Sequence, residues 1–260
     1  MRKVNNNMPA AKKILSNAEI ISLALFFPRN GTLVLGDLHL GKEEGLANQG
    51  VLVPRTSFAQ IMKEIEKIFA RAKEIKGQEK VKKVVLMGDV KNEFGRPGAQ
   101  EWKEVLALFN FLKAHAERVI VLKGNHDNYI KLILKAKEAE FRDYFIENEV
   151  LFCHGDKIIE GTEAKKAGAE KCKFIVVGHA HPAFILNDEY KTEKFKCFAA
   201  RKQGNKKIVV MPSLNPLSKG TDILRGELIS PYLLGAKEFE IWAVEEGQVF
   251  YFGRKKRVLE

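Results

Sequence analysis

The sequence has few cysteines, and their positions do not suggest a zinc knuckle or a disulfide framework. Its 260 residues include only 3 cysteines, Cys153, Cys172 and Cys197, with no Cys-x-x-Cys spacing. A protein held together by disulfides would need a denser and even-numbered set. We therefore expect all three to be buried as small apolar side chains in a reducing compartment.

The sequence also lacks an apolar run of membrane-spanning length. The longest near-continuous run, residues 20–27, is far shorter than the ~20 residues that a transmembrane helix needs. Lys12 and Lys13 precede an apolar stretch as in a signal peptide, but Glu19 interrupts that stretch and no small-x-small cleavage site follows. We expect a cytoplasmic protein without integral membrane association.

Acidic residues are too few to balance the basic ones, and the formal net charge is +11. Much of the excess lies in residues 1–13 and 254–260, which we expect to be flexible basic tails. Residues 191–207 carry seven bases and a single acid. This segment is a candidate contact for nucleic acid or another phosphate-bearing partner. The alternative is a solvated, Lys- and Glu-rich surface of the kind found in heat-adapted proteins.

Short apolar runs alternate with longer amphipathic segments, and no repeat or Pro-rich linker divides residues 1–260. We therefore expect one domain. Strands are predicted at Thr32–Leu35, 83–87 and 118–122, and helices at Ser57–Lys76 and Ala99–His115 between them. Two such β-α-β steps indicate parallel strands. The later predicted strands are Val150–Cys153, Phe174–Val177, 195–200, 207–211, 238–244 and 248–252. The expected architecture is a layered, mixed α/β domain with its chemistry at the carboxyl ends of strands.

Five polar clusters follow five of these strand-like runs. They are Gly36-Asp37-Leu38-His39, Gly88-Asp89, Gly124-Asn125-His126-Asp127, Cys153-His154-Gly155-Asp156 and Gly178-His179-Ala180-His181. The chain has 6 histidines, and all except His115 lie in these clusters. Carboxylate, amide and imidazole donors suit Mn, Fe, Zn, Co or Ni better than calcium. The donors are too many for one tetrahedral ion, but they suit two neighbouring ions that share a carboxylate.

In this order, the clusters resemble the pattern D-x-H, GD, GNH, H and GH-x-H of the calcineurin-like metallophosphoesterase superfamily. The resemblance spans residues 37–181 and implies a mixed β-sheet sandwich flanked by helices. It implies that Asp37, His39 and His181 bind one divalent ion, that Asn125, His154 and His179 bind the other, and that Asp89 bridges them. Mn is the favoured ion, with Fe, Zn, Ni or Co as alternatives. Met211-Pro212-Ser213 and Ser230-Pro231-Tyr232 further resemble a prokaryotic branch of predicted phosphoesterases.

The resemblance also assigns roles in a reaction. It implies that a hydroxide bridging the two ions attacks phosphorus, and that His126, free of metal, assists the leaving oxygen. Asp127 would orient His126 from behind, and Asp156 is either a similar supporting residue or a turn residue. Phosphodiester hydrolysis, of a cyclic nucleotide or nucleic acid, is favoured. The alternative is a phosphomonoesterase or pyrophosphohydrolase acting on a nucleotide or small metabolite, because no nucleic-acid-binding module is recognisable.

Two further expectations concern the surroundings of the clusters. Lys42, Arg55 and Arg96 lie near the first two clusters in sequence, where they would either contact substrate phosphate or remain surface charges. Many relatives have an acidic residue or histidine three positions after the bridging aspartate, whereas this chain has Asn92. A non-catalytic, protein-binding member of the superfamily would have lost ligands or the histidine, and here His126 is retained. We therefore expect an enzyme.

Overall fold

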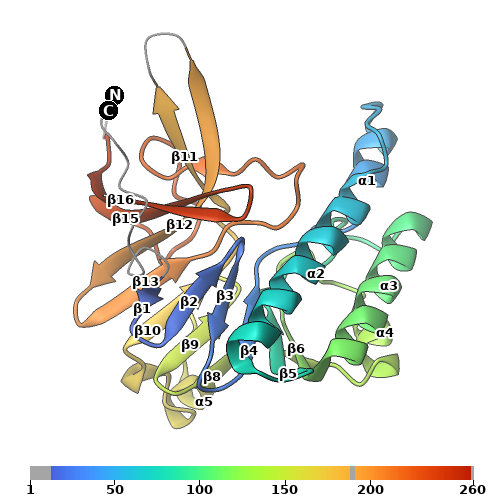
Figure 1. Ribbon diagram of the computed structural model, residues 1–260, viewed down its shortest axis with the longest axis horizontal. Coiled ribbons are helices and arrows are strands. Elements are labelled where there is room, and N and C mark those ends of the chain that lie inside the picture. Colours follow the sequence, from blue (N-terminus) through green and yellow to red (C-terminus); the bar gives the residue numbers. More distant parts are fainter. Residues whose placement is uncertain (1–12, 188–190, 259–260) are drawn as a thin grey trace.

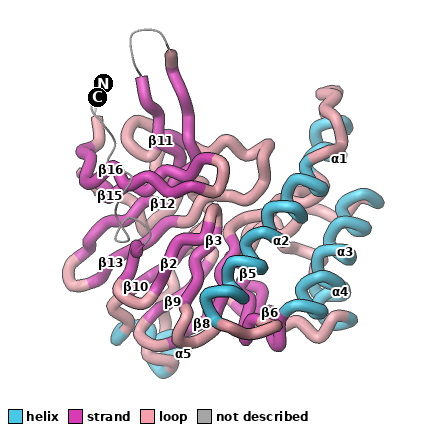
Figure 2. Tube along the Cα trace, in the orientation of Figure 1, coloured by secondary structure: helices cyan, strands magenta, loops and turns pink. Residues whose placement is uncertain are grey.

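Two β-sheets pack face to face in the described part of the chain, and helices cover the outer side of the first sheet (Figure 1). The computed structural model describes residues 13–187 and 191–258. The predicted tail at 1–13 therefore falls almost wholly outside the described residues. Figure 2 shows α1 to α4 gathered on one side of the strands.

The first sheet has seven described strands, which follow one another in chain order. They are β1 (Lys13–Leu15), β2 (Ala18–Ile21), β3 (Ala24–Phe27), β4 (Thr32–Leu35), β5 (Val81–Leu86), β6 (Ala116–Leu122) and β7 (Glu140–Arg142). Strands β1 to β4 form an antiparallel meander, whereas β4 to β7 are parallel. The helices of this half are α1 (Lys42–Asn48), α2 (Ser57–Lys76), α3 (Ala99–His115) and α4 (Lys131–Ala136). The two long helices, α2 and α3, are the crossovers that parallel strands require.

The second sheet contains the remaining described strands. They are β8 (Tyr144–Glu147), β9 (Val150–Cys153), β10 (Phe174–Val177), β11 (Pro182–Asn187), β12 (Thr192–Gln203), β13 (Lys206–Val210), β14 (Thr221–Asp222), β15 (Glu238–Glu245) and β16 (Gln248–Lys256). Strands β9, β10 and β13 run parallel, and the hairpin of β15 and β16 joins through β12. Helix α5 (Thr162–Lys166) and a 3₁₀ turn at Ala169–Lys171 lie between β9 and β10 in the chain.

Alternate residues of the central strands face different cores. Val85 of β5 and Val209 of β13 belong to the cluster between the sheets. Val84 instead faces α2 and α3, and Ile208 belongs to the cluster on the outer face of the second sheet. Because both faces of these strands are buried, their sequences are continuously apolar rather than alternating. The mixed sandwich expected from the sequence is confirmed.

The basic end of the chain differs from the prediction. Residues 254–256 belong to β16, where Lys256 pairs with Glu238 and Arg254 with Glu240. Opposite charges across an antiparallel ladder stabilise it, so the strand continues into the segment expected to be a tail. The three cysteines are buried and unpaired, as predicted. None of the helices in the described ranges is both long and apolar enough to cross a membrane.

Candidate metal centre

The five polar clusters meet at one end of the sandwich. Asp37, Asp89 and Asn125 follow β4, β5 and β6, which are parallel neighbours, and His154 and His179 follow the parallel pair β9 and β10. Backbone hydrogen bonds join adjacent clusters: the amide of His39 donates to the carbonyl of Asp89 at 2.8 Å. The fold therefore brings together residues as far apart in the sequence as Asp37 and His181.

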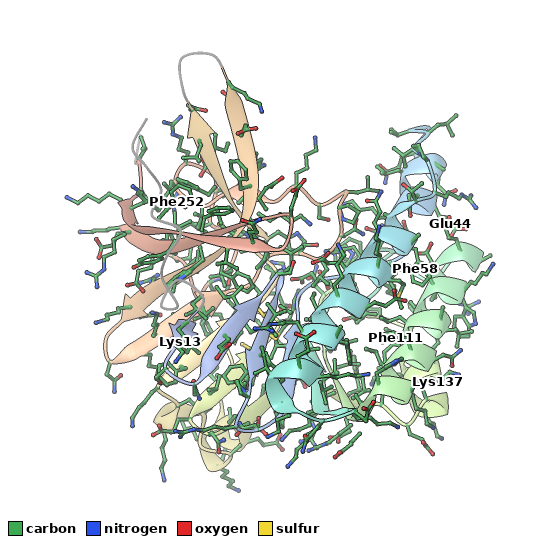
Figure 3. The ribbon with its side chains drawn as sticks, in the orientation of Figure 1. Lys13, Glu44, Phe58, Phe111, Lys137 and Phe252 are labelled. Atoms are coloured by element: carbon green, nitrogen blue, oxygen red, sulfur yellow. The ribbon has the colours of Figure 1, made fainter. Side chains whose placement is uncertain are left out.

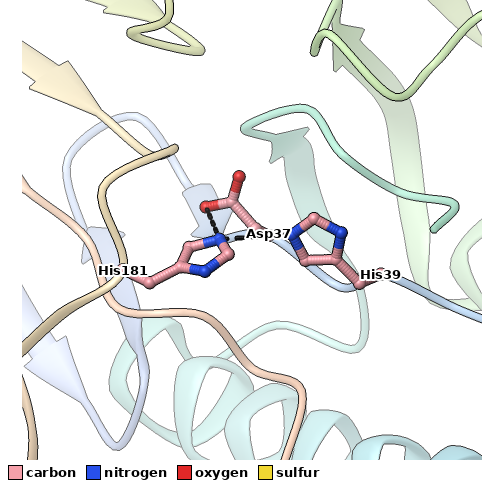
Figure 4. A group of neighbouring side chains, drawn as sticks. All are labelled: Asp37, His39 and His181. Carbon is pink, nitrogen blue, oxygen red and sulfur yellow. Dashed lines mark hydrogen bonds and ion pairs between the residues drawn. The ribbon is translucent and has the colours of Figure 1, made fainter. Parts of the chain in front are cut away.

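One group of candidate ligands combines both sheets. Asp37 and His39 come from the loop after β4, and His181 comes from the loop after β10 (Figure 4). The Nε2 atom of His181 lies 3.6 Å from Oδ2 of Asp37 and 3.3 Å from Nε2 of His39. One ligand atom from each of the three residues lies within 4.8 Å of the others, which is close enough to surround a single ion.

A second group lies beside the first and consists of Asp89, His154 and His179. Oδ2 of Asp89 is 3.4 Å from Nε2 of His154 and 3.7 Å from Nε2 of His39. Oδ1 of Asn125 is 3.0 Å from Nε2 of His154. Asp89 thus faces ligands of both groups, and the structure brings all seven predicted metal-binding residues into one cluster.

Four of these candidate ligands have unusual backbone conformations. They are His39 (φ 43°), Asp89 (φ 48°), His179 (φ 62°) and His181 (φ 41°). A residue with a side chain avoids positive φ, at a cost of roughly 1–3 kcal/mol. Gly178 shows how tight the turns are, because a Cβ there would lie 2.6 Å from Oδ2 of Asp37. Strained backbone of this kind is typical of sites where side-chain placement has been fixed for function.

The charges of the cluster fit divalent cations. Asp37 and Asp89 are 0% and 2% exposed. Burial opposes ionisation of Asp37, but the nearby imidazoles of His181, His154 and His39 outweigh it and hold its pKa below the usual value. Burial lowers the pKa of His39 to about 3, so this imidazole is neutral, the form that binds metal.

Two imidazoles show how the protein alone balances these charges. Burial acts against a charged His154, yet its hydrogen bond to Asp89 and the charge of Asp37 raise its pKa to about 10. The Nδ1 atom of His39 is buried without a hydrogen-bond partner. A third combination, His39, Asp89 and His126, also has ligand atoms that lie within 4.8 Å of one another. Buried carboxylates and imidazoles whose donor atoms converge are the ligand set of a transition-metal site.

Comparison with known proteins agrees with this geometry. The sequence model described as "Calcineurin-like phosphoesterase" matches residues 32–230. The chain belongs to the calcineurin-like phosphoesterase family. It is a phosphoesterase with an intact His/Asp metal site.

Several solved structures are similar to this phosphoesterase, and the first of those below shares its fold. The Pseudomonas putida nuclease MPE is 15% identical with a TM-score of 0.60, over 90% of this chain and 94% of that chain. Vacuolar Protein Sorting 29 from Cryptosporidium parvum is 13% identical over 87% of this chain and 97% of that chain, with a TM-score of 0.39. A predicted phosphoesterase from Streptococcus pneumoniae is 14% identical over 88% and 91%, with a TM-score of 0.32. A search of curated proteins gave no match.

His126 is held differently from the prediction for this phosphoesterase. Its Nε2 atom lies 3.8 Å from Oδ2 of Asp89, next to the ligand groups. The ring is oriented by the carbonyl oxygen of Asn92, to which Nδ1 donates. Asp127, which was expected to orient His126, instead accepts hydrogen bonds from the amides of Val90 at 2.9 Å and Gly124 at 3.0 Å. It therefore ties together the loops after β5 and β6. Burial, with the charge of Asp89, raises the pKa of Asp127 to about 7.

A sixth loop, after β13, also supports the centre and was not assigned a role from the sequence. The Ser213 hydroxyl donates to the carbonyl of Asp37 at 2.8 Å. The side-chain amide of Asn215 donates through Nδ2 to the carbonyls of Leu38 at 2.8 Å and His39 at 2.9 Å. Ser213 and Asn215 are polar residues that closely follow a strand-like run, as the residues of the five clusters do. These residues fix the backbone that presents Asp37 and His39.

The outer residues of the prediction are dispersed. The Lys42 ammonium donates to the Ser218 hydroxyl at 2.8 Å, and burial lowers its pKa. Arg55 and Arg96 lie exposed on loops. Asp156 is partly exposed. Burial and the charge of His154 lower the pKa of His179, and the charge of Asp156 opposes this effect only in part. The structure thus brings only Lys42 toward the loop after β13 that supports the centre.

The bases of residues 191–207 do not form one surface. Lys196 is partly buried and donates to the carbonyls of Ser213 at 2.8 Å and Asn215 at 2.6 Å, and this burial lowers its pKa to about 7. Lys207 pairs with Glu240 at 2.8 Å. Arg201 and Lys202 instead line a cavity of about 630 Å³ together with bases from 237–257. Its basic lining residues are Arg201, Lys202, Lys237, Arg254, Lys256 and Arg257.

Proposed function

We propose that this chain is a dinuclear-metal phosphodiesterase whose substrate is a nucleic acid strand. The observation that carries the proposal is the position of Asp89, whose carboxylate lies 3.4 Å from His154 of one group and 3.7 Å from His39 of the other. One carboxylate shared by two sets of ligands is the arrangement that a pair of ions requires. Manganese is the proposed ion, because hard oxygen and imidazole donors are mixed.

Each residue has a role in this proposal. Asp37, His39 and His181 would hold one ion, Asn125, His154 and His179 would hold the second, and Asp89 would contribute its carboxylate to both. When bound, the ions would activate a water as nucleophile and stabilise the phosphoryl oxygens. The Asn92 carbonyl accepts a hydrogen bond from Nδ1–H of His126, so Nε2 is the ring atom left for the leaving oxygen. As general acid, His126 would start as the imidazolium, give its Nε2 proton to the leaving oxygen and end as the neutral tautomer that keeps the Nδ1 proton.

Two observations favour nucleic acid over a small monoester. The structure with a TM-score of 0.60 to this chain is named a nuclease. The basic cavity described above collects six cations and two acids, Glu238 and Glu240, from segments that are far apart in sequence. Several cations around one cavity suit a strand with successive phosphates. A phosphomonoesterase would need only enough cations for one phosphate.

The first test is turnover by metal-stripped protein reconstituted with manganese. A chromogenic phosphodiester should be cleaved in preference to the matching monoester, and no cleavage of either should occur before metal is added. A preference for the monoester would favour the alternative, a nucleotide or metabolite phosphatase. Stable folding without metal-dependent turnover of either would contradict a hydrolase and favour a protein-binding scaffold.

The second test measures how binding of a single-stranded oligonucleotide depends on salt. Lys202→Glu/Lys256→Glu should weaken binding and reduce the slope of log K against log salt by about 1.4, because each phosphate contact contributes ~0.7 for single strands. Lys63→Glu/Lys103→Glu, on α2 and α3, changes the net charge equally. This control should leave the slope unchanged. Equal effects of the two pairs would mean that net charge alone, rather than the cavity, governs binding.

A further inference from the structure

Phe94 combines high exposure with close packing against His126. Its side chain is 57% exposed, yet its ring stacks on the His126 ring with centroids 3.8 Å apart and an angle of 28°. His126 therefore covers one face of the phenyl ring, and much of the remaining surface is open to solvent. Leaving an aromatic ring so exposed gives up part of the hydrophobic stabilisation that its burial would provide.

The loop that carries Phe94 is fixed from beneath by two buried charged residues. The Lys91 side chain is 0% exposed, and its ammonium donates to the carbonyls of Glu93 and Gly95, on either side of Phe94. Oε1 of Glu101, a residue 1% exposed, accepts from the amides of Asn92 at 2.6 Å and Glu93 at 2.8 Å. The exposed ring is thus held in place by a built structure rather than left on a free loop.

The same loop already orients His126 without needing an aromatic residue. The Asn92 carbonyl accepts the Nδ1 proton of His126, which sets the ring's tautomer. Packing against one face of His126 could be supplied by any apolar side chain. An exposed aromatic ring is not required for packing on His126. Such a ring is, however, the kind of side chain on which planar ligands stack.

We infer that Phe94 is a stacking platform for a planar group on the leaving-group side of the scissile phosphate. The inference rests on the proposed function, in which Nε2 of His126 delivers its proton to the leaving oxygen. The group attached to that oxygen must then pass beside the ring stacked on His126. In a nucleic acid strand, the planar group nearest to that oxygen is a nucleobase. Phe94 is therefore a residue that determines specificity.

The test compares an oligonucleotide with a copy that lacks one base on the leaving-group side of the cleaved bond. For the unmodified enzyme, loss of that base should lower kcat/KM about tenfold, within the range of base–aromatic stacking. Phe94→Ala should cleave both strands at similar rates, and Phe94→Trp should restore the difference. Tyr251→Ala removes another exposed aromatic ring, on β16. This control should keep the tenfold difference.

Two results would overturn the platform. One is a tenfold base preference that persists in Phe94→Ala. The other is a lower rate of Phe94→Ala on both strands with the preference unchanged, which would show that the ring only positions His126. An unmodified enzyme that cleaves no oligonucleotide but hydrolyses bis(4-nitrophenyl) phosphate would instead refute the nucleic-acid function. The stacking role of Phe94 would then be tested with that planar diester. Phe94→Ala should raise its KM several-fold, and an unchanged KM would overturn the stacking role.

Discussion

Replacing Asp89 with asparagine is expected to lower phosphodiester hydrolysis by about 10³-fold or more. Asp89 is the carboxylate that faces both ligand groups, so the substitution removes the negative charge that the two proposed cations would share. In the native protein, the backbone amide of His126 donates a hydrogen bond to Oδ1 of Asp89 at 3.0 Å. The side-chain oxygen of asparagine can accept the same hydrogen bond. We therefore expect a folded protein in which the bound metal falls below two ions per chain.

Metal analysis after dialysis, together with the rate in saturating manganese, tests this prediction. Asp143→Asn is the matched control, because that carboxylate is exposed and pairs with Lys157 at 3.2 Å. It should keep two ions and the full rate. A metal-loaded Asp89→Asn protein with two ions and a rate near that of the unmodified enzyme would show that Asp89 does not bridge the ions. Circular dichroism of both variants separates loss of metal from loss of fold.

The parts of the fold that follow local patterns could be predicted from the sequence. The helix Ser57–Lys76 buries one face and has apolar residues at three- and four-residue spacing. The strand Thr32–Leu35 is buried on both faces and is continuously apolar apart from Thr32. Both were predicted with the bounds that the structure shows. Strands β1 to β3 were not predicted. The near-continuous apolar run 20–27 spans the end of β2 and all of β3, and Ser22 is the only polar residue at the turn between them.

The side chains of the centre could be predicted from the sequence, but the backbone groups that support them could not. The aspartates and histidines could be recognised because they follow strand-like runs in a fixed order. The orienting group for His126 could not, since it is the backbone carbonyl of Asn92, which every residue possesses. Asp127 lies next to His126 in the chain, but its carboxylate bonds to the backbone of Val90 and Gly124. Proximity in sequence was therefore a poor guide to contact here.

The basic segment shows how a charge count along the chain differs from a charged surface. Residues 191–207 occupy β12, a two-residue turn and β13, so neighbouring side chains point to opposite faces of the sheet. Some of the bases are used internally, as Lys196 is on two carbonyls. The cavity bases instead come from separate segments that meet in space, with Lys202 on β12 and Lys256 on β16.

Replacing His126 with alanine is expected to lower kcat by about 10²–10⁴-fold while the protein keeps both metal ions. In the proposed site, its Nε2 lies beside the metal-binding residues, 3.8 Å from Oδ2 of Asp89, and its Nδ1 is held by the Asn92 carbonyl. In the proposed reaction, its contribution is a proton for the leaving oxygen. That contribution matters most when the leaving oxygen is strongly basic, because such a group departs poorly as an anion.

The decisive measurement therefore compares two diesters, one releasing 4-nitrophenolate and one releasing a nucleoside alkoxide. The loss in His126→Ala should be much smaller for 4-nitrophenolate, which leaves readily without a proton. His115→Ala is the control, since His115 contacts the Phe111 carbonyl on α3 at 2.9 Å. It should leave both rates unchanged. Equal losses with the two leaving groups, or loss of an ion from His126→Ala, would instead make His126 a binding or metal-holding residue.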